Sequence, residues 1–177
     1  MFIGSKACNY ISIKYEFSKI EKIIFERMYR DYISELGQFS DRIKAEPVSA
    51  QEFENIYNNQ SLIKIFILNN SGVKIGFCLL GFGDNTHPET DYYIGEFYIA
   101  PEHRREGWGR SAIKELLSLL PGKYCYHILK GNKVARLFWD RVVKASKSVK
   151  LRLYDISNLS DCDFFAFDCS KLKQVVI

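Results

Sequence analysis

Residues 92–120, YYIGEFYIAPEHRREGWGRSAIKELLSLL, carry the pattern that decides the fold prediction. The segment starts with alternating aromatic and β-branched residues, which is typical of a half-buried strand over residues 92–100. Pro101 ends that strand because proline has no N–H group to donate to a neighbouring strand. Gly107 and Gly109 follow, and the next apolar residues recur at helical spacing: Ala112, Ile113, Leu116, Leu117 and Leu120. The sequence therefore predicts a strand, a glycine turn and a helix in direct succession.

A turn of this kind is suited to binding an anion. The first N–H groups of a helix lack partners inside it, and the helix dipole adds partial positive charge there. Glycines allow the backbone to approach a ligand closely, and a diphosphate fits such a cup. Two familiar phosphate loops do not match, because one needs GxGxxG and the other needs GxxxxGK followed by Ser or Thr. The sequence therefore indicates a diphosphate site of another type.

The first third of the chain predicts one strand and two helices. The strand is expected over residues 10–16 from its alternating pattern. Ser18 and Glu21 form a capping box for a helix that ends near Gly37, with apolar side chains on one side: Ile20, Ile24, Phe25, Met28, Tyr29, Tyr32 and Ile33. Residues 38–48 are polar and contain a proline, which predicts a loop. A second capping box, Ser49 with Glu52, predicts a short helix that runs to Tyr57.

The remaining segments alternate between strands and helices. A hairpin is expected from strands 62–68 and 73–81 around the turn 69–72, and a second polar turn covers residues 83–90. After the glycine helix come a strand over 123–129, a helix over 133–144, a strand over 149–153, a turn over 155–161 and a closing strand over 164–167. The apolar residues of helix 133–144 nearly encircle it, which predicts a buried helix. The predicted order is β-α-α-β-β-β-α-β-α-β-β.

Length and composition predict one domain, residues 1–177. The chain is 47% apolar and 15% aromatic, which is enough for a packed core, and its net charge of +4 is too mild for a nucleic-acid surface. The five cysteines are an odd number without CxxC spacing, so we expect buried thiols rather than disulfides or a metal site, and a cytoplasmic location. The sequence shows neither a leader peptide nor a membrane-spanning run, so no membrane partner is expected.

Two motifs carry a resemblance to a known family. Arg104-x-x-Gly107-x-Gly109 resembles the acetyl-CoA signature Gln/Arg-x-x-Gly-x-Gly/Ala of the GNAT-type N-acetyltransferases. Asn132-x-x-Ala135-x-x-Phe138-Trp139 is similar to the Asn-x-x-Ala-x-x-Phe-Tyr helix of the same family. The resemblance is specific over residues 92–143, and elsewhere the order of elements agrees. It implies a single-domain α/β fold of the GNAT (acyl-CoA N-acyltransferase) type: a mixed, mostly antiparallel central sheet of six to seven strands, helices on both faces, and splayed central strands.

The resemblance implies acetyl-CoA as the co-substrate and assigns residues to it. The pantetheine arm would lie between the splayed strands on the backbone of Phe97, Tyr98 and Ile99. The diphosphate would bind backbone N–H groups of the glycine turn, with the side chain of Arg110 nearby; the predicted contacts are Arg104, Arg105, Glu106, Gly107, Trp108, Gly109, Arg110 and Ser111. Asn132 and Phe138 of the second motif are also expected at the cofactor. Asn132 is in the first place a helix cap, and it can serve in both ways.

Glu96 is the candidate general base of the implied reaction. Acetyl transfer to an amine requires a base near neutral pH, and a carboxylate beside apolar neighbours has a raised pKa. Strand alternation predicts that Glu96 lies on the face of Tyr92, Ile94 and Tyr98. The other interpretation of Glu96, an ion pair with a nearby Lys or Arg, has equal weight. The N–H group of Ile99 is expected to stabilise the oxyanion.

One residue departs from the family pattern. The family's usual general acid is a tyrosine at the position of Trp139, and an indole cannot release a proton near neutral pH. Packing is therefore the favoured role for Trp139. Water, Tyr98 and Tyr126 remain open as groups that could protonate the leaving thiolate. His103 and His127 are interpreted as a solvated loop residue and a packed strand residue.

The implied function is direct acetyl transfer from acetyl-CoA to a primary amine, more readily that of a small molecule than of a protein. A non-catalytic acyl-CoA-binding module of the same fold is the alternative, because of Trp139. A nucleotide-phosphate binding protein is a weaker one, because the glycine spacing disagrees. The acidic residues Asp84, Glu89 and Asp91 are expected in a solvated turn, although they could attract a cationic acceptor. The sequence does not specify the acceptor or the oligomeric state, and a homodimer is compatible with it.

Overall fold

A computed structural model describes residues 10–45, 48–146, 148–151 and 160–171 of the chain. Its described strands form one sheet of seven in the order β1-β2-β3-β4-β5-β7-β6. These strands are β1 (Ile11–Lys14), β2 (Leu62–Leu68), β3 (Lys74–Phe82), β4 (Tyr92–Ile99), β5 (Lys123–Leu129), β6 (Val149–Leu151) and β7 (Cys162–Asp168). Every neighbouring pair is antiparallel except β4 and β5, which are parallel. The predicted mixed, mostly antiparallel sheet is confirmed.

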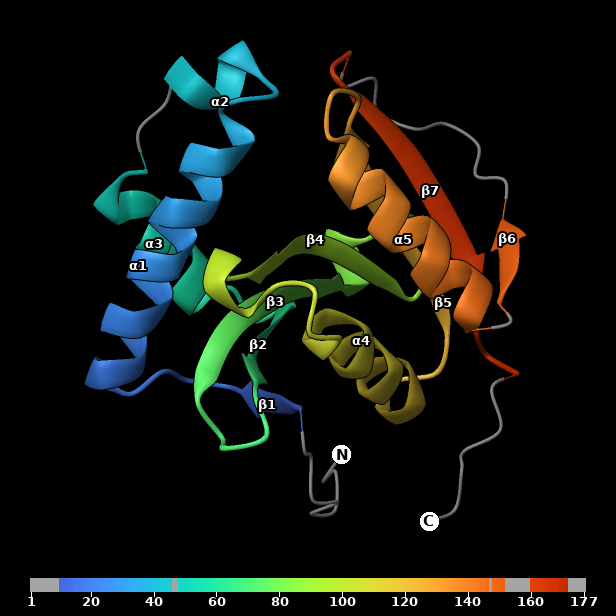
Figure 1. Cartoon of the computed structure of the whole chain (residues 1–177), viewed down its shortest axis with the longest axis horizontal. Helices are drawn as coiled ribbons and strands as arrows, with labels where there is room; N and C mark the ends of the chain where they lie inside the picture. The colour runs from blue at the N-terminus through green and yellow to red at the C-terminus, as the bar shows by residue number, and fades with distance from the viewer. Residues whose placement is uncertain (1–9, 46–47, 147, 152–159, 172–177) are drawn as a thin grey trace.

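Helices cover both faces of this sheet, as predicted (Figure 1). The helices are α1 (Lys19–Leu36), α2 (Asp41–Ala45), α3 (Ala50–Asn58), α4 (Trp108–Leu119) and α5 (Lys133–Ala145). On one face, α1 and α3 pack against β2, β3 and β4 through a cluster rich in aromatic residues: Phe25, Tyr29, Phe53, Phe66, Phe77 and Tyr98. On the other face, α4 and α5 bury a more aliphatic cluster that includes Ile94, Ile113, Leu116, Leu117, Tyr124 and Val142. Burial of each such side chain contributes about 1.5–3 kcal/mol, so both faces hold the sheet rigidly.

The predicted capping box at the start of α1 is confirmed. The Ser18 hydroxyl accepts a hydrogen bond from the backbone N–H of Glu21 at 3.3 Å, and the Glu21 carboxylate accepts one from the N–H of Ser18 at 3.0 Å. At α3, Ser49 caps the helix in the same way, but the Glu52 carboxylate instead accepts the Tyr29 hydroxyl at 2.9 Å. The second capping box is therefore only half formed, and Glu52 ties α3 to α1.

The central strands separate partway along their length. β4 and β5 pair only from Tyr92 to Ile94, against Tyr124 to Tyr126. Beyond Ile94, β4 continues beside β3 alone, so one of its edges is open toward β5. The predicted splay of the central strands is confirmed, and it opens a gap in the middle of the sheet.

A β-bulge at Gly95 corrects the predicted orientation of Glu96. Leu80 lies opposite Ile94 and Leu79 lies opposite Glu96, so Gly95 is an extra residue in β4. An extra residue shifts the alternation by one. Glu96 therefore lies on the opposite face from Tyr92 and Ile94, and the prediction that it shares their face is wrong. Those two residues pack in the cluster under α4 and α5 together with Phe97 and Ile99, whereas Tyr98 packs under α1. Glu96 points to the α1 side, since it bonds to Tyr32 of that helix.

Two further predictions are wrong and one is only partly tested. The segment 38–48, expected to be a loop, contains the short helix α2. Helix α5 is not buried all round, because Val134 and Leu137 are 77% and 57% exposed, while one side with Trp139, Val142 and Val143 is buried. Strand β6 is described for residues 149–151. Residues 152–153 of the predicted strand and 155–159 of the predicted turn lie outside the described residues.

The cysteines are buried thiols as far as the structure describes them. Cys78, Cys125, Cys162 and Cys169 are free and buried, and Cys8 lies outside the described residues. Among the described helices, none has the length and apolar character to cross a membrane.

Candidate active site

The turn between β4 and α4 forms a cup of backbone N–H groups. After β4, residues Pro101–His103 make one turn of 3₁₀ helix, and Gly107 then caps α4 with φ of 92°. Arg105 also has a positive φ of 68°. Left-handed residues in a short turn aim successive N–H groups toward one point, and the first N–H groups of α4 have no partners inside the helix. Such a turn is suited to an anion, and the predicted binding of a diphosphate there stays a prediction.

The two glycines of the motif are required for different reasons. A Cβ at Gly107 would meet nothing within 4 Å, but its φ of 92° disfavours any L side chain. A Cβ at Gly109 would lie 3.3 Å from the Phe138 ring and 3.5 Å from the Phe97 ring. The first glycine therefore shapes the cup, whereas the second lets α4 approach β4 and α5 closely.

The open edge of β4 presents the backbone of Phe97 and Ile99 to the gap. Ile99 lies opposite Gly76 of β3, and the N–H of Ala100 bonds to the carbonyl of Ile75 at 2.9 Å. In an antiparallel pair this pattern turns the N–H and C=O groups of Ile99 away from β3. By the same alternation Phe97 also faces the gap, whereas the backbone of Tyr98 faces β3. The predicted backbone contacts to pantetheine therefore concentrate on Phe97 and Ile99, beside a Phe138 ring that stacks on Phe97 at 5.4 Å.

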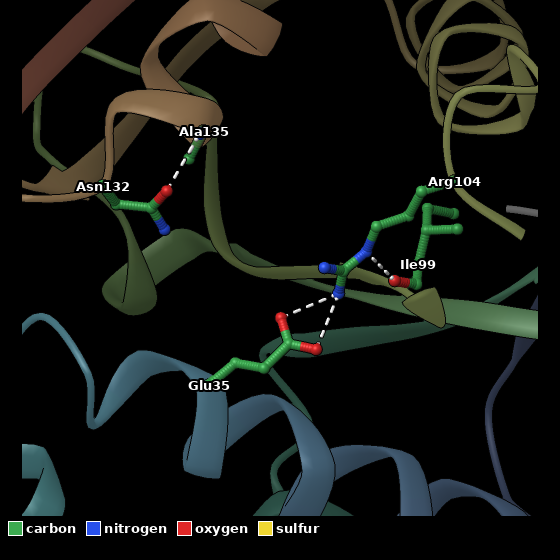
Figure 2. Close-up of polar contacts among 5 residues, drawn as sticks. All are labelled: Glu35, Ile99, Arg104, Asn132 and Ala135. Carbon is green, nitrogen blue, oxygen red and sulfur yellow. Dashed lines mark hydrogen bonds and ion pairs between the residues drawn. The ribbon is translucent and has the colours of Figure 1, made fainter. Parts of the chain in front are cut away.

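Asn132 caps α5 at the far side of this gap (Figure 2). Its side-chain oxygen accepts a hydrogen bond from the N–H of Ala135 at 3.0 Å, which confirms the predicted cap. Its side-chain NH₂ group remains for other contacts, and Asn132 also lines the cavity described below. The additional role at the cofactor stays a prediction.

Glu96 is a half-buried carboxylate that hydrogen-bonds a tyrosine. The Tyr32 hydroxyl donates to the Glu96 carboxylate at 2.5 Å. Burial raises the pKa of Glu96 to about 7, and the charge of Glu52 adds to this rise, although the hydrogen bond from Tyr32 opposes it. None of the ion pairs among the described residues includes Glu96. A carboxylate of this kind exchanges a proton near neutral pH, as a general base must.

A cavity opens beside Glu96 between α1, β4, β5 and α5. Its walls include Tyr32, Leu36, Gly95, Phe97, His127 and Trp139. His127 bonds through Nδ1 to the Tyr93 hydroxyl and stacks on the Tyr93 ring at 5.7 Å, so the predicted packing role is present. Burial lowers the pKa of His127, which favours the neutral imidazole. The cavity, about 80 Å³ in volume, therefore combines apolar walls with a few polar groups.

The groups considered for protonating the leaving thiolate lie on opposite faces of the sheet. Trp139 is buried and its ring stacks on Tyr126 with centroids 4.7 Å apart, which fits the favoured packing role. Burial raises the pKa of Tyr98 to about 12 and also raises that of Tyr126. Both hydroxyls thus hold their protons firmly near neutral pH and are suited to donate hydrogen bonds.

Arg104 does not direct its side chain toward the α4 cup. Figure 2 shows its guanidinium extending to Glu35 of α1, with bonds of 2.9 and 2.8 Å to the two carboxylate oxygens. Its Nε also donates to the carbonyl of Ile99 at 2.7 Å. The backbone N–H of Arg104 bonds to the carbonyl of Pro101 at 3.2 Å. Arg104 therefore belongs to the turn through its backbone and to α1 through its side chain.

Three residues at the site, Tyr32, Glu35 and Leu36, were missed by the reasoning from sequence. Tyr32 was expected only on the apolar side of α1, and Glu35 and Leu36 were not singled out. Their partners lie far away in the sequence, with separations of 64 residues for Tyr32 and Glu96 and 69 for Glu35 and Arg104. The one signal in the sequence is the aromatic side of α1, which indicates that this helix packs on the aromatic face of the sheet.

The fold and the site together define an acyl-CoA-dependent transferase, and comparison with known proteins agrees. The model of the acetyltransferase (GNAT) family matches residues 25–143. The chain belongs to this family. No curated protein matches the sequence significantly.

Solved structures of the same fold share little sequence with this chain. Diaminobutyrate acetyltransferase EctA from Paenibacillus lautus, in complex with L-2,4-diaminobutyric acid and coenzyme A, superposes with a TM-score of 0.60 at 12% identity over 90% of this chain and 95% of its own. Spermidine N-acetyltransferase from Vibrio cholerae, with CoA and spermine, gives 0.59 at 14% identity over 91% and 96%. Arabidopsis thaliana NAA60, with acetyl-CoA, gives 0.53 at 16% identity over 89% and 97%. At such identities the likeness concerns the fold alone.

Proposed function

We propose that the protein transfers the acetyl group of acetyl-CoA directly to the primary amine of a small molecule. The observation that carries this proposal is Glu96, a carboxylate with a pKa of about 7 that accepts a hydrogen bond from Tyr32, a residue of the wall of a cavity at the gap between β4 and β5. A general base, an acceptor cavity and an open strand edge meet at this point. Direct transfer needs these three features in one place.

Each step of the transfer is assigned to particular residues. The α4 cup receives the diphosphate, and the backbone of Phe97 and Ile99 pairs with the pantetheine amides, as an added strand would. Glu96 accepts a proton from the acceptor ammonium, and the nitrogen lone pair then attacks the thioester carbonyl carbon. The new C–N bond forms while the Ile99 N–H stabilises the oxyanion. The C–S bond breaks as the carbonyl re-forms. The nitrogen loses its second proton and the thiolate takes one up, so the products are the N-acetylamine and coenzyme A, and Glu96 returns its own proton to solvent.

The polar groups around the cavity support a cationic acceptor. Glu96 lies directly behind the wall, bonded to the lining residue Tyr32, and Glu52 lies close enough to raise the pKa of Glu96. Two of the similar structures contain a diamino acid, L-2,4-diaminobutyric acid, and a polyamine, spermine, both of which carry a net positive charge at neutral pH. We therefore place small diamines and polyamines first among the acceptors to be tested.

A non-catalytic acyl-CoA-binding module remains the second candidate. Trp139 favours it, since this residue is packed against Tyr126 and Phe97 and supplies no acid to the leaving thiolate. The two candidates differ in turnover. A module would bind acetyl-CoA and release no free thiol above the rate of spontaneous hydrolysis.

The test is release of free thiol from acetyl-CoA in the presence of polyamines, diamino acids, amino sugars and peptides. We expect acceptor-dependent release with at least one small amine, and acetylated product by mass spectrometry. Binding of acetyl-CoA without acceptor-dependent release across the whole panel would favour the module.

The cup itself is tested by Gly107→Ala. Forcing an alanine into a left-handed conformation costs about 1–2 kcal/mol, so the dissociation constant of acetyl-CoA should rise about tenfold in calorimetry. Gly72→Ala is the matched control, because Gly72 has a φ of 74° and also has open space around its Cβ position, but lies in the β2–β3 turn. An equal affinity loss in both variants would contradict a specific role for Gly107.

Three broader predictions from the sequence stay proposals. A single domain over residues 1–177 is supported by the sheet, which joins strands from β1 to β7. A cytoplasmic location is supported by the four buried free thiols. The oligomeric state, a homodimer included, is a matter for measurement in solution.

A further inference from the structure

The ion pair of Arg104 and Glu35 joins two parts of the proposed active site. Arg104 stands in the glycine motif that precedes α4, and Glu35 stands in the last turn of α1. Both Glu35 oxygens bond to one guanidinium nitrogen, and Nε of Arg104 also bonds to the Ile99 carbonyl. The pair is partly shielded, with side-chain exposures of 40% for Arg104 and 33% for Glu35. Solvent therefore screens the ion pair in part, and its geometry is reinforced by the additional bond from Nε to the Ile99 carbonyl.

Arg104 compensates an unfavourable charge at the C-terminal end of α1. Its last turn is Ile33-Ser34-Glu35-Leu36, whose one charge is negative. A negative charge at a helix C-terminus opposes the helix dipole, so Glu35 destabilises the end of α1 unless a cation compensates it. Arg104 supplies that cation from the other side of the site (Figure 2).

The C-terminal end of α1 also forms a wall of the cavity. Tyr32 and Leu36, on either side of Glu35 along the helix, both line the cavity, and Tyr32 donates to Glu96. A series of contacts connects the ion pair to Glu96. The Arg104 guanidinium lies 5.4 Å from the centre of the Tyr98 ring, and the Tyr98 ring packs against Tyr32 with centroids 5.7 Å apart. Movement of the α1 end would therefore move the cavity wall and Tyr32 together.

We infer that Arg104 and Glu35 are a positioning pair that ties the acceptor wall on α1 to the cofactor strand β4. This inference rests on the proposed acetyl transfer, because it assigns the α1 side of the cavity to the acceptor. It also departs from what the motif alone suggests. The side chain of Arg104 acts on the acceptor side, while its backbone belongs to the cofactor turn.

The tests are Glu35→Gln and Arg104→Gln, with Glu102→Gln as the control. Glu102 is an exposed carboxylate two residues before Arg104, so its loss changes the charge of the same segment. Hydrogen exchange of residues 30–37 should become faster in Arg104→Gln, which leaves the Glu35 charge uncompensated at the helix end, faster to a smaller extent in Glu35→Gln, which also removes that charge, and stay unchanged in the control. This measurement needs no catalysis, so it stands even if acetyl transfer is absent. Unchanged exchange in both pair variants would overturn the inference.

Kinetics separate positioning from general stability. In both pair variants the KM of the acceptor should rise about five- to tenfold, as expected for loss of one charge-assisted contact, while the KM of acetyl-CoA stays within about twofold. The exchanged pair Glu35→Arg with Arg104→Glu should recover part of the lost exchange protection and of the acceptor KM. An equal rise in the KM of acetyl-CoA would place the Arg104 side chain at the cofactor and overturn the inference. If the wild-type protein transfers no acetyl group, the proposed function is rejected instead. Hydrogen exchange of residues 30–37 would then decide whether the ion pair holds the end of α1.

Discussion

Two glutamates on the α1 side of the sheet, Glu21 and Glu96, have pKa values that are shifted in opposite directions. Glu21, in the first turn of α1, receives the Lys14 ammonium at 2.8 Å, the Lys74 ammonium at 3.6 Å and the N–H of Ser18. The bond from Lys14 is the main cause that lowers the pKa of Glu21 to about 2. Among the described residues Glu96, on β4, has one side-chain donor, the neutral Tyr32, and burial raises the pKa of Glu96 to about 7. The residue type is the same, but the neighbours decide its protonation.

The difference separates a structural carboxylate from a chemical one. Glu21 is held ionised by two lysines and cannot exchange a proton near neutral pH. Glu96 exchanges its proton in the range where an amine acceptor must lose one. A perturbed pKa in itself marks neither role, because both glutamates are shifted by a similar amount. The direction of the shift and the adjoining cavity distinguish them.

The largest expected effect is on catalysis. Glu96→Gln should reduce kcat/KM for the acceptor by about 10²–10⁴-fold, the usual contribution of a general base. Glu21→Gln should leave kcat within about twofold, since Glu21 lies at the opposite end of α1 from Glu35 and Leu36. Steady-state thiol release with both variants checks this. A Glu96→Gln enzyme with wild-type activity would remove Glu96 as the base and leave the fold assignment in place.

The second effect is on stability, and its sign differs between the two sites. The pKa of Glu96 is higher in the folded state than the ordinary 4.5, so its contribution to stability is complete below pH 4.5 and is lost as the pH rises through about 7. Glu96→Gln should therefore raise the free energy of unfolding at pH 8.5 by roughly 2–3 kcal/mol, with little change at pH 4.5.

Glu21 should show the reverse. Its folded pKa is lower than 4.5, so its contribution is complete above pH 4.5 and is lost as the pH falls through about 2. Glu21→Gln should lower the free energy of unfolding by about 1–2 kcal/mol at pH 7, after allowance for solvent screening of Lys14. Urea titrations of both variants at several pH values measure these terms. Equal signs at pH 8.5 would contradict the contrast between the two sites.

The smallest effect concerns the hydrogen bonds that each glutamate accepts. Tyr32→Phe removes the O–H that lowers the pKa of Glu96, so this pKa should rise by roughly half to one unit. Ser18→Ala should leave Glu21 ionised, because Lys14 is its main partner, but the lost helix cap should cost about 1 kcal/mol of stability. Titration and urea unfolding of the two variants check these outcomes. A fall in the pKa of Glu96 on Tyr32→Phe would show that water entry outweighs the lost bond.

The sequence was informative where local patterns determine structure. The capping box at Ser18, the cap at Asn132 and strand β5 were predicted at the observed residues, because each depends on neighbours within a few positions. The glycine motif likewise identified the turn before α4. The positive φ of 92° at Gly107 is a local backbone conformation, and a glycine between a strand and a helix is a local sign of it.

The predictions that were wrong depend on contacts that the sequence does not display. The bulge at Gly95 is one extra residue relative to β3, and alternation along β4 alone cannot reveal it. The five-residue helix α2 is too short for a periodic pattern. Val134 and Leu137 suggested that α5 is buried all round, but the sheet lies on one side of that helix only. Glu35 as the partner of Arg104 follows from the fold and from no local motif.

The most direct test of the account is the titration of Glu96 itself. Carbon-13 NMR of protein labelled at the glutamate carboxyl carbon, with the spectrum of Glu96→Gln to assign the signal, follows its protonation without an acceptor. The account predicts a midpoint near pH 7, set by burial of the carboxylate beside Tyr32. A midpoint at or below the ordinary 4.5 would show that Glu96 is solvated and cannot be the poised base on which the proposed function depends.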